Sequence, residues 1–509
     1  MSTRTGEPLD AQVVVVGAGP VGLMLAGELR SAGVSVAVID RLPAPMQESR
    51  ASQLNTRTAE ILHARGLKGL LDEAQPEPRA HFGGLGLDLS RLDSPYAGNW
   101  KVPQYRTEAA LARRARDLGA AILRPCELRG LTVHRRHVLC RAEGPDGPVL
   151  LRARFVAGCD GEGSAVRELA GFAFPGAAET RELLRADVTG IDVPDRRFER
   201  LERGMAVAMT RQGVTRVMVH AFGRAPAARQ GPPAFAEVAD LWERVTGEDI
   251  SHGTPIWVDA FGDAHGQVTR YRRGRVLLAG DAAHRHMPIG GQSVNVGLQD
   301  AVNLGWRLAA RVHGWAGDGL LDGYHAERHP VAARVLRAVR AQETLLLGGP
   351  EVAALRTVLA ELLTRKGAND HLAGLVSGLD VRYGTGRHPL IGRRVPHVAL
   401  RAAGPGAASS TADLWGRGRG VLLRLPGSPR TRAEIGELVS GWAGRVSVVD
   451  AEPAPEAAAL QDAHSLLLRP DGHVAWADGE ESDLAGALHH WFGAPSRRRA
   501  HRPQREWSA

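Results

Sequence analysis

A carboxylate and a glycine-rich turn lie close together in the segment 275–309, which reads RVLLAGDAAHRHMPIGGQSVNVGLQDAVNLGWRLA. Asp281 follows a short apolar run, 276–279, of the kind that forms a buried parallel strand. Gly290 and Gly291 then precede an apolar pattern with helical spacing. This order predicts a carboxylate at a strand end and backbone N–H groups at a helix start. Such helix starts attract electron-rich oxygens, and ligands of open α/β sheets bind at this edge.

The first motif along the chain, a glycine motif near the N-terminus, has the spacing of a dinucleotide-binding fingerprint. Residues 12–16 predict a buried strand, GAGPVG opens a predicted helix that runs to about Ala32, and a second strand, 34–39, leads to Asp40. Asp40 could accept hydrogen bonds from ribose hydroxyls, and its charge would repel a 2′-phosphate. A glycine turn with a purely structural role is the alternative. Gly17 would permit the tight turn, Gly19 would let the backbone approach a pyrophosphate, and Gly22 would allow close helix packing.

The second motif along the chain, RFVAGCDGEG at 154–163, lies between this glycine motif and the third motif, the segment 275–309. It predicts another strand, which ends at Asp160 and is followed by a short helix with Ser164 and Arg167. Asp160 could contact a ligand, or it could simply close a turn at the strand end. The order of GxGxxG, then DG with Ser and Arg, then GD with GGQ resembles the class A flavoprotein monooxygenases, the p-hydroxybenzoate hydroxylase-like enzymes. The resemblance covers about residues 10–395.

The resemblance implies that the cofactor is FAD. Asp281 would bind its ribityl chain, and Asp160 would support the pyrophosphate region and the passage of NAD(P)H. Arg50 would lie near the flavin ring, where it is the candidate catalytic residue. Gln104, expected with Glu108 just before a helix, would hold FAD, with an ordinary surface role as the alternative. The remaining expected contacts are Gly17, Gly19, Pro20, Val21, Gly22, Asp40, Arg41, Gly280, Pro288, Gly290, Gly291, Gln292, Ser293 and Asn295.

Further matches resemble the aromatic polyketide hydroxylases of the angucycline, anthracycline and tetracycline pathways. Members of that group commonly read GGQGxN in the turn, whereas this chain reads GGQSVN, with Ser293 in place of a glycine. Serine can cap a helix, so the helix start is retained. The space beside the flavin, and with it the substrate shape or the reaction outcome, could differ.

The chemistry that the resemblance implies is oxygen transfer. NADPH or NADH would reduce FAD, and the reduced flavin would react with O₂ to form a C(4a)-hydroperoxide that inserts one oxygen atom into a polycyclic aromatic polyketide in antibiotic biosynthesis. A Baeyer–Villiger or oxidative ring-opening reaction on the same substrates is the alternative. A non-catalytic flavin-binding scaffold is less favoured, because a scaffold needs no ring-facing turn.

The pattern along the chain predicts an α/β protein of three parts. The resemblance implies that these are a Rossmann-like FAD-binding domain, an inserted β-rich substrate domain and a C-terminal thioredoxin-like domain. The FAD-binding domain would comprise residues 1–174 and 275–400, and the substrate-binding sheet would comprise 175–274. Residues 401–495 show a β-α-β-β-β-α pattern without cysteine, which excludes thiol redox chemistry and favours packing or dimer contact. Residues 496–509 form an expected basic, disordered tail. Candidate pocket residues of the sheet, with core packing as an equal alternative, are Met205, Met209, Met218 and Trp257.

Composition limits the partners. The chain has 64 Lys and Arg against 56 Asp and Glu, but arginines and acids are interspersed, so no nucleic-acid partner is expected. The three cysteines lack metal-ligand spacing, and His284 and His286 have no carboxylate cluster nearby in the sequence, so no metal is expected. No apolar run reaches the roughly 18–20 residues of a membrane span, and no signal pattern is seen. We therefore expect a cytoplasmic monomer or homodimer without a membrane partner.

Overall fold

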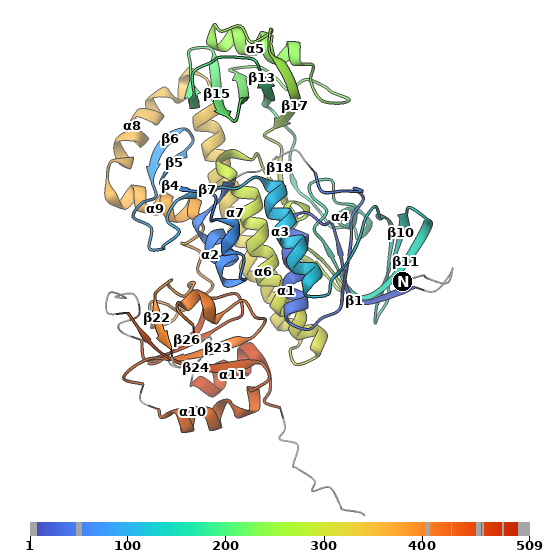
Figure 1. Ribbon diagram of the computed structural model, residues 1–509, viewed down its shortest axis with the longest axis vertical. Helices are drawn as coiled ribbons and strands as arrows, with labels where there is room; N and C mark the ends of the chain where they lie inside the picture. The colour runs from blue at the N-terminus through green and yellow to red at the C-terminus, as the bar shows by residue number, and fades with distance from the viewer. Residues whose placement is uncertain are drawn as a thin grey trace, which may run out of the picture.

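The computed structural model describes residues 8–46, 53–402, 408–428, 430–454, 460, 463–480 and 483–496. Three bodies follow one another along the long axis of the molecule (Figure 1). A central body contains the glycine motifs, an antiparallel sheet lies at one end, and the C-terminal module lies at the other.

The central sheet is mainly parallel and has the order β19-β20-β11-β1-β2-β8. The strand predicted at 154–160 is longer at its start and ends at Gly158, so Asp160 lies beyond it. The reason is local: Asp160 accepts hydrogen bonds from the Ser164 hydroxyl and the Val166 N–H, which turns the chain into the next helix. The strands are β1 (Leu9–Val16), β2 (Val36–Ile39), β8 (Ala121–Leu123), β9 (Glu127–Val133), β10 (Val138–Gly144), β11 (Gly147–Gly158), β19 (Arg272–Arg273) and β20 (Val276–Leu278).

Helices pack on this sheet through the glycine motifs. Gly22 is required for this contact, because a Cβ there would lie 1.9 Å from the carbonyl oxygen of Gly17. Gln104 and Glu108 do not precede a helix as the sequence predicts; they lie in its first two turns, because the helix begins directly after Pro103. The helices of the central body are α1 (Pro20–Ser31), α2 (Thr56–Ala64), α3 (Gln104–Asp117), α4 (Ala165–Leu169), α6 (Gln292–His313) and α7 (Asp318–Leu347).

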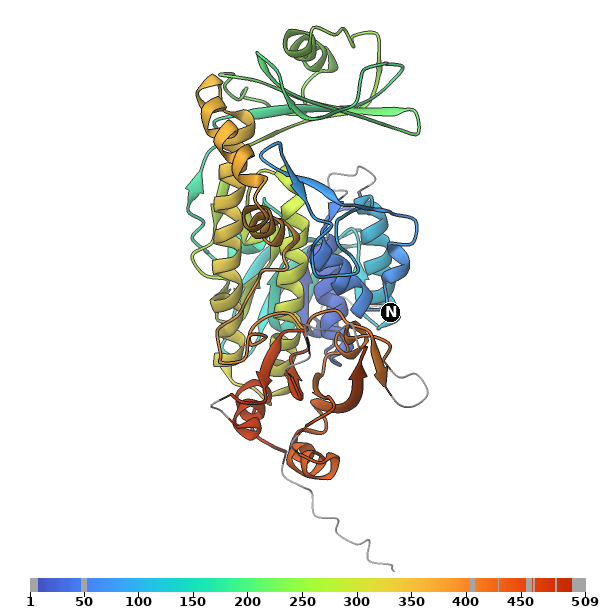
Figure 2. The same cartoon turned by 90° about the vertical axis from the view of Figure 1, so that its left-hand side faces the viewer.

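The antiparallel sheet has the order β14-β15-β16-β13-β17, with α5 (Phe235–Thr246) packed on its outer face. Its inner face is turned toward the central body (Figure 2). Met205 is fully buried in the core that continues into that body, so core packing describes this residue. The strands are β13 (Glu182–Thr189), β14 (Arg196–Arg200), β15 (Gly204–Arg211), β16 (Val214–Ala221) and β17 (Thr254–Gly262). Short strands at the junction with the central body are β12 (Gly176–Ala177), β18 (His265–Gln267) and β21 (His284–Arg285).

A small lobe beside the antiparallel sheet was not expected from the sequence. A hairpin packs on three helices through an apolar cluster that includes Phe82, Leu87, Leu345 and Val376. The elements of this region are β3 (Gln53–Leu54), β4 (Pro76–Glu77), β5 (Arg79–Phe82), β6 (Leu85–Asp88), β7 (Asn99–Lys101), α8 (Ala353–Leu363) and α9 (Lys366–Ser377).

The C-terminal module contains the β-α-β-β-β-α order that the sequence predicts, with an additional first strand. Its sheet has the order β22-β24-β23-β25-β26, in which only β23 and β24 are parallel. Of the expected tail, residues 496–509, only Ser496 lies within the described residues. The elements are β22 (Leu400–Ala402), β23 (Gly420–Arg424), α10 (Arg432–Val439), β24 (Val446–Pro453), β25 (Ser465–Leu468), β26 (Val474–Ala477) and α11 (Leu484–Phe492).

Candidate active site

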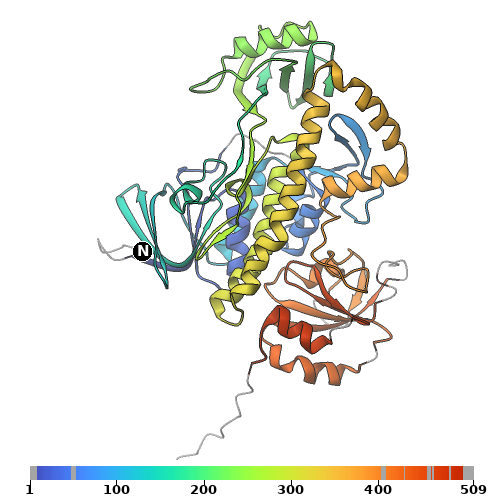
Figure 3. The same cartoon turned by 180° about the vertical axis from the view of Figure 1, so that it is seen from behind.

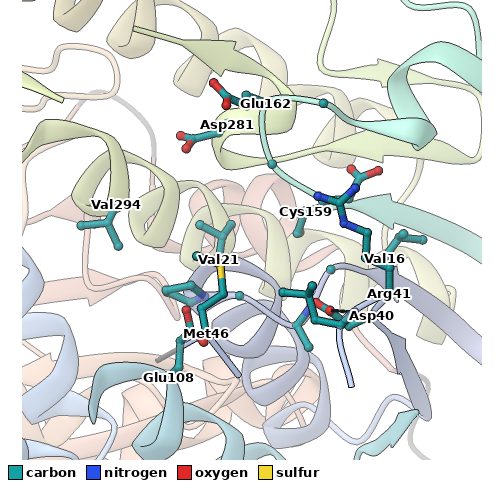
Figure 4. Close-up of a pocket in the computed structure, with 18 of the residues that line it drawn as sticks. Val16, Val21, Asp40, Arg41, Met46, Glu108, Cys159, Glu162, Asp281 and Val294 are labelled. Carbon is teal, nitrogen blue, oxygen red and sulfur yellow. Dashed lines mark hydrogen bonds between the residues drawn. The ribbon is translucent and has the colours of Figure 1, made fainter. Parts of the chain in front are cut away.

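A cavity of about 550 Å³ lies at the carboxyl ends of β1, β2, β11 and β20. It extends from the first glycine motif to the inner face of the antiparallel sheet, where Arg185, Asp259 and Phe261 line it. Figure 4 shows the side chains of Asp40, Arg41, Glu108 and Asp281 around this space, from three distant parts of the chain. The sequence-predicted residues that line it are Gly17, Gly19, Pro20, Val21, Asp40, Arg41, Gln104, Asp160, Asp281, Pro288 and Ser293.

At one end of the cavity, Asp40 holds the glycine turn. Its carboxylate accepts hydrogen bonds from the backbone N–H of Ala18, at 2.6 Å, and of Leu42, at 2.8 Å. Arg124 approaches the same carboxylate at 3.5 Å and donates to the carbonyl of Ala18 at 2.8 Å. Sequence analysis missed Arg124, because only the pairing of β8 with β2 brings it to this edge. Asp40 thus stabilises the turn in addition to the role that the fingerprint predicts.

Asp160 performs the turn role that the sequence left open as an alternative, and it also lines the cavity. Its hydrogen bonds to Ser164, at 2.6 Å, and to the Val166 N–H, at 3.0 Å, hold the start of α4. Burial raises the pKa of the Asp160 carboxyl above its usual range. Arg167 donates to the carbonyls of Glu162 and Ala282 and so ties α4 to the third motif.

At the other end, Asp281, Pro288 and Ser293 line the cavity. The Asp281 side chain is exposed to the cavity but is surrounded by protein, and this burial raises the pKa of its carboxyl. Gly290 and Gly291 have φ angles of 69° and 67°, a conformation that residues with a Cβ rarely adopt. Gly291 is the N-cap residue of α6, and no side-chain hydrogen bond is made from this position. The first backbone N–H groups of α6 therefore lack a capping side chain.

The remaining predicted residues support the turn and do not line the cavity. Gln292 donates to the carbonyl of Val376 at 3.1 Å, and Asn295 donates to those of Gln53, at 3.0 Å, and Gly291, at 2.6 Å. Gly22, Gly280, Gly290 and Gly291 are likewise absent from the lining. Arg50 lies outside the described residues.

Histidines near the third motif have ordinary partners. His284 bonds to Asp300 at 2.7 Å inside a buried network with Arg328, and His286 bonds to the carbonyl of Met287 and lines the cavity. Within the described ranges, no three His, Cys, Asp or Glu side chains are grouped so that they could hold a metal ion. No helix in the described part of the chain is long and apolar enough to cross a membrane.

Comparison with known proteins identifies the family. Residues 10–339 match the FAD binding domain family, and residues 388–495 match the family described as aromatic-ring hydroxylase, C-terminal. The chain is 40% identical over 507 residues to 12-dehydrotetracycline 5-monooxygenase/anhydrotetracycline 6-monooxygenase of Streptomyces rimosus, covering 95% of this chain and 99% of the relative. The chain belongs to the class A FAD-dependent aromatic monooxygenases.

Solved structures agree with this assignment. The fold of this monooxygenase matches the crystal structure of an aromatic hydroxylase from angucycline biosynthesis with a TM-score of 0.91 and 47% identity, covering 96% of this chain and 100% of that chain. The chain is also 37% identical over 488 residues to a dialkyldecalin synthase of Streptomyces rugosporus, covering 94% of this chain and 98% of the relative. Membership alone therefore does not define the reaction of one member.

Two features of the monooxygenase cavity fit FAD. A Cβ built at Gly19 meets no atom within 4 Å, so the space beside the start of α1 is open to a pyrophosphate. The Nη1 atom of Arg124 is buried and lies 3.5 Å from the Asp40 carboxylate, but it makes no hydrogen bond among the described residues, which suits an acceptor-rich ligand at this point. Glu108 lies nearby, and burial raises the pKa of its carboxyl.

Proposed function

We propose that this protein is an NAD(P)H-consuming FAD monooxygenase that inserts one oxygen atom from O₂ into a polycyclic aromatic polyketide in antibiotic biosynthesis. The observation that supports this most strongly is the continuous cavity, which joins the dinucleotide fingerprint to the inner face of the antiparallel sheet. One end suits a nucleotide and the other end has aromatic and arginine side chains, so cofactor and substrate could meet within it.

The residues that would hold FAD follow the length of the cavity. Gly19 and the start of α1 would bind the pyrophosphate, Asp40 the ribose, and Asp281 the ribityl chain, with Gln104 as a further contact. Pro288 and Ser293 would lie beside the ring. When bound, FAD would take electrons from NADH or NADPH and activate O₂.

The protein would contribute binding, orientation and exclusion of water. The inner face of the antiparallel sheet would cover the substrate, and the start of α6 would place its backbone N–H groups near the electron-rich flavin. We propose that Arg50 supplies a polar group at the ring. The C-terminal module would be a thioredoxin-like packing or dimer-contact domain, since it contains none of the cysteines of this chain.

The second candidate is a Baeyer–Villiger or oxidative ring-opening reaction on the same class of substrate. Ser293 favours this candidate, because it lines the cavity at the end where the flavin ring would lie. A hydroxyl there could alter the position of the substrate relative to the ring, and this would change which bond receives oxygen.

The test begins with the purified protein. We expect it to bind FAD and to oxidise NADH or NADPH faster when anthraquinone-like or angucyclinone-like compounds are added. Under labelled O₂, mass spectrometry should find one label atom in a product whose rings are intact. A labelled product with a cleaved ring would favour the second candidate. A protein that takes up no FAD, or whose NAD(P)H oxidation responds to no such compound, would contradict the proposal.

A further inference from the structure

Two arginine–aspartate pairs lie on the inner face of the antiparallel sheet. Arg185 on β13 donates to Asp259 on β17 at 2.7 Å, and Arg216 on β16 donates to Asp187 on β13, also at 2.7 Å. Both guanidinium groups lie over the ring of Trp257, at 4.6 Å and 6.0 Å. The pairs therefore have the same chemistry and share one aromatic neighbour.

The two pairs differ in their relation to the cavity. Arg185 and Asp259 line it, whereas Arg216 and Asp187 are not among its lining residues. Arg216 uses both Nε and Nη2 in its bonds to Asp187. The Nε of Arg185, by contrast, is buried and has no hydrogen-bond partner among the described residues. One arginine is thus satisfied within the protein, whereas the other lines the cavity and has one donor without a partner.

The surroundings of Arg185 restrict how a ligand can use it. In the strand register Arg185 lies opposite Asp259, and Trp257 and Phe261 occupy the same face two residues to either side. The guanidinium lies 4.6 Å from the first ring centroid and 5.0 Å from the second, and the residue is only 6% exposed. Its orientation is therefore fixed by two rings and one carboxylate, and little rotamer entropy would be lost on binding.

Burial makes an unused donor costly. Arginine remains charged in proteins, and a buried N–H of a charged group without an acceptor loses the hydrogen bond that water would provide. Burial lowers the pKa of Arg185, although the hydrogen bond to Asp259 opposes this shift. An acceptor oxygen supplied by a ligand in the cavity would remove the penalty, whereas an apolar ring edge would leave it.

We propose that Arg185 is a specificity-determining residue that donates a hydrogen bond to a carbonyl or ring-hydroxyl oxygen of the aromatic substrate. Trp257, Phe261 and Asp259 position it. The inference rests on the proposed function, because it assumes that the aromatic substrate occupies this end of the cavity. It predicts that this protein selects oxygenated ring systems over plain hydrocarbons of the same shape.

The test compares two ligands that share a three-ring skeleton. Anthraquinone has carbonyl oxygens and anthracene has none. Dissociation constants would be measured on the FAD-loaded full chain from the change in flavin absorbance. The variant is Arg185→Gln, and the matched control is Arg216→Gln, which removes the equivalent arginine of the second pair.

We expect Arg185→Gln to weaken anthraquinone binding about ten- to a hundredfold, as for the loss of a hydrogen bond to a charged group, and to change anthracene binding less than about twofold. Arg216→Gln should change neither by more than about twofold. In turnover, Arg185→Gln should raise KM for an oxygenated substrate more than it lowers kcat, and Arg185→Lys should restore part of the loss.

An equal loss for both ligands would show that Arg185 acts only through packing and would overturn the inference, as would an unchanged preference for anthraquinone. If Arg185→Gln fails to fold, the double variant Arg185→Met with Asp259→Asn removes both members of the pair and permits the same comparison. The two proposals fail separately. Oxygenation by the unaltered protein with an unchanged preference in Arg185→Gln contradicts only this inference, whereas absence of FAD or of any oxygenation contradicts the proposed function.

Discussion

Two glycines of the first motif have opposite surroundings, although they are only three residues apart. A Cβ at Gly19 would project into open space at the cavity, whereas a Cβ at Gly22 would lie 1.9 Å from the carbonyl oxygen of Gly17. We expect Gly19→Ala to fold normally and to bind FAD more weakly. Gly22→Ala should lose about 1–3 kcal/mol of unfolding free energy, because the helix must move away from the turn.

Thermal unfolding together with the flavin content of each purified variant checks this pair. The interpretation requires the two effects to separate. If Gly19→Ala were the less stable variant, the role of open space at the start of α1 would be contradicted.

Asp281 gives a prediction about pH. Burial raises the pKa of its carboxyl above the ordinary value of 3.8. If the ionised form accepts hydrogen bonds from the ribityl hydroxyls, FAD affinity is constant above this raised pKa and falls as the pH decreases through it. We expect Asp281→Asn to bind FAD about tenfold more weakly at neutral pH and to lose this acid dependence. Flavin fluorescence released on acidification measures both effects, and an identical pH profile in the variant would contradict the assignment.

At the residue scale, the sequence predicts what local spacing determines. The glycines, Asp40 and Asp281 belong to short motifs in which a strand, a turn and a helix are consecutive, so their positions follow from the motif. Arg124 and Arg185 could not be found in this way, because strand pairing over long separations brings them to the cavity. For Gln292 and Asn295, the place in a motif does not reveal that they bond to the carbonyls of Val376 and Gln53, and their contact with the cofactor stays a prediction.

At the element scale, helix α7 connects the bodies of the molecule, as the long gold helix in Figure 3 shows. Near the end of α7, the buried Glu343 lies by the two crossings, the segments at residues 180–181 and 263 in which the chain enters and leaves the antiparallel sheet. Asp263 of the second crossing accepts hydrogen bonds from the Thr180 and Arg181 N–H groups of the first. Burial, followed by the charge of Asp263, raises the pKa of Glu343 to about 7. A proton on Glu343 thus favours this packing.

This raised pKa predicts a change in stability with pH. The stabilisation from the protonated carboxyl is complete below the ordinary pKa of 4.5 and is lost as the pH rises through about 7. Glu343→Gln should therefore be as stable as the unaltered protein near pH 5 and more stable at pH 8, by at most about 3 kcal/mol. Urea unfolding at the two pH values measures the difference. A stability difference that does not grow with pH would show that Glu343 ionises freely in the folded protein.

Element prediction from the sequence was successful where periodicity is strong and failed where elements are short. The order of the C-terminal module agrees with the structure because its strands are apolar and clearly bounded. The hairpin β5–β6 and helix α9 were missed, because each buries only a few side chains in the small cluster around Phe82. The start of α3 was placed too late, since Pro103 ends the preceding segment at the residue where the helix begins.

At the scale of the whole molecule, a buried charge network joins the C-terminal module to the central body. Arg469 of the module donates to both oxygens of Glu327 on α7, at 2.7 and 2.8 Å, and also to Asp471. Trp306 of α6 donates to Asp471 at 3.2 Å, and Arg307 approaches Glu327 at 2.6 Å. Burial alone would raise the pKa of Glu327, but Arg469 and Arg307 hold it at about 2. The two bodies should therefore unfold together.

Removing the central arginine tests this coupling. Arg469→Met leaves two buried carboxylates without their main partner, so we expect a loss of about 3–5 kcal/mol of unfolding free energy at neutral pH. Arg424→Met is the control, because Arg424 pairs with Asp450 at 2.7 Å at a partly exposed site of the same module and should cost less than about 1 kcal/mol. Loss of Arg469 also raises the pKa of Glu327, so protonation relieves the unpaired charge, and the deficit should shrink as the pH falls. Calorimetry across pH would measure this. Equal costs for the two variants, or a deficit that grows in acid, would mean that the network does not couple the module to the cofactor domain.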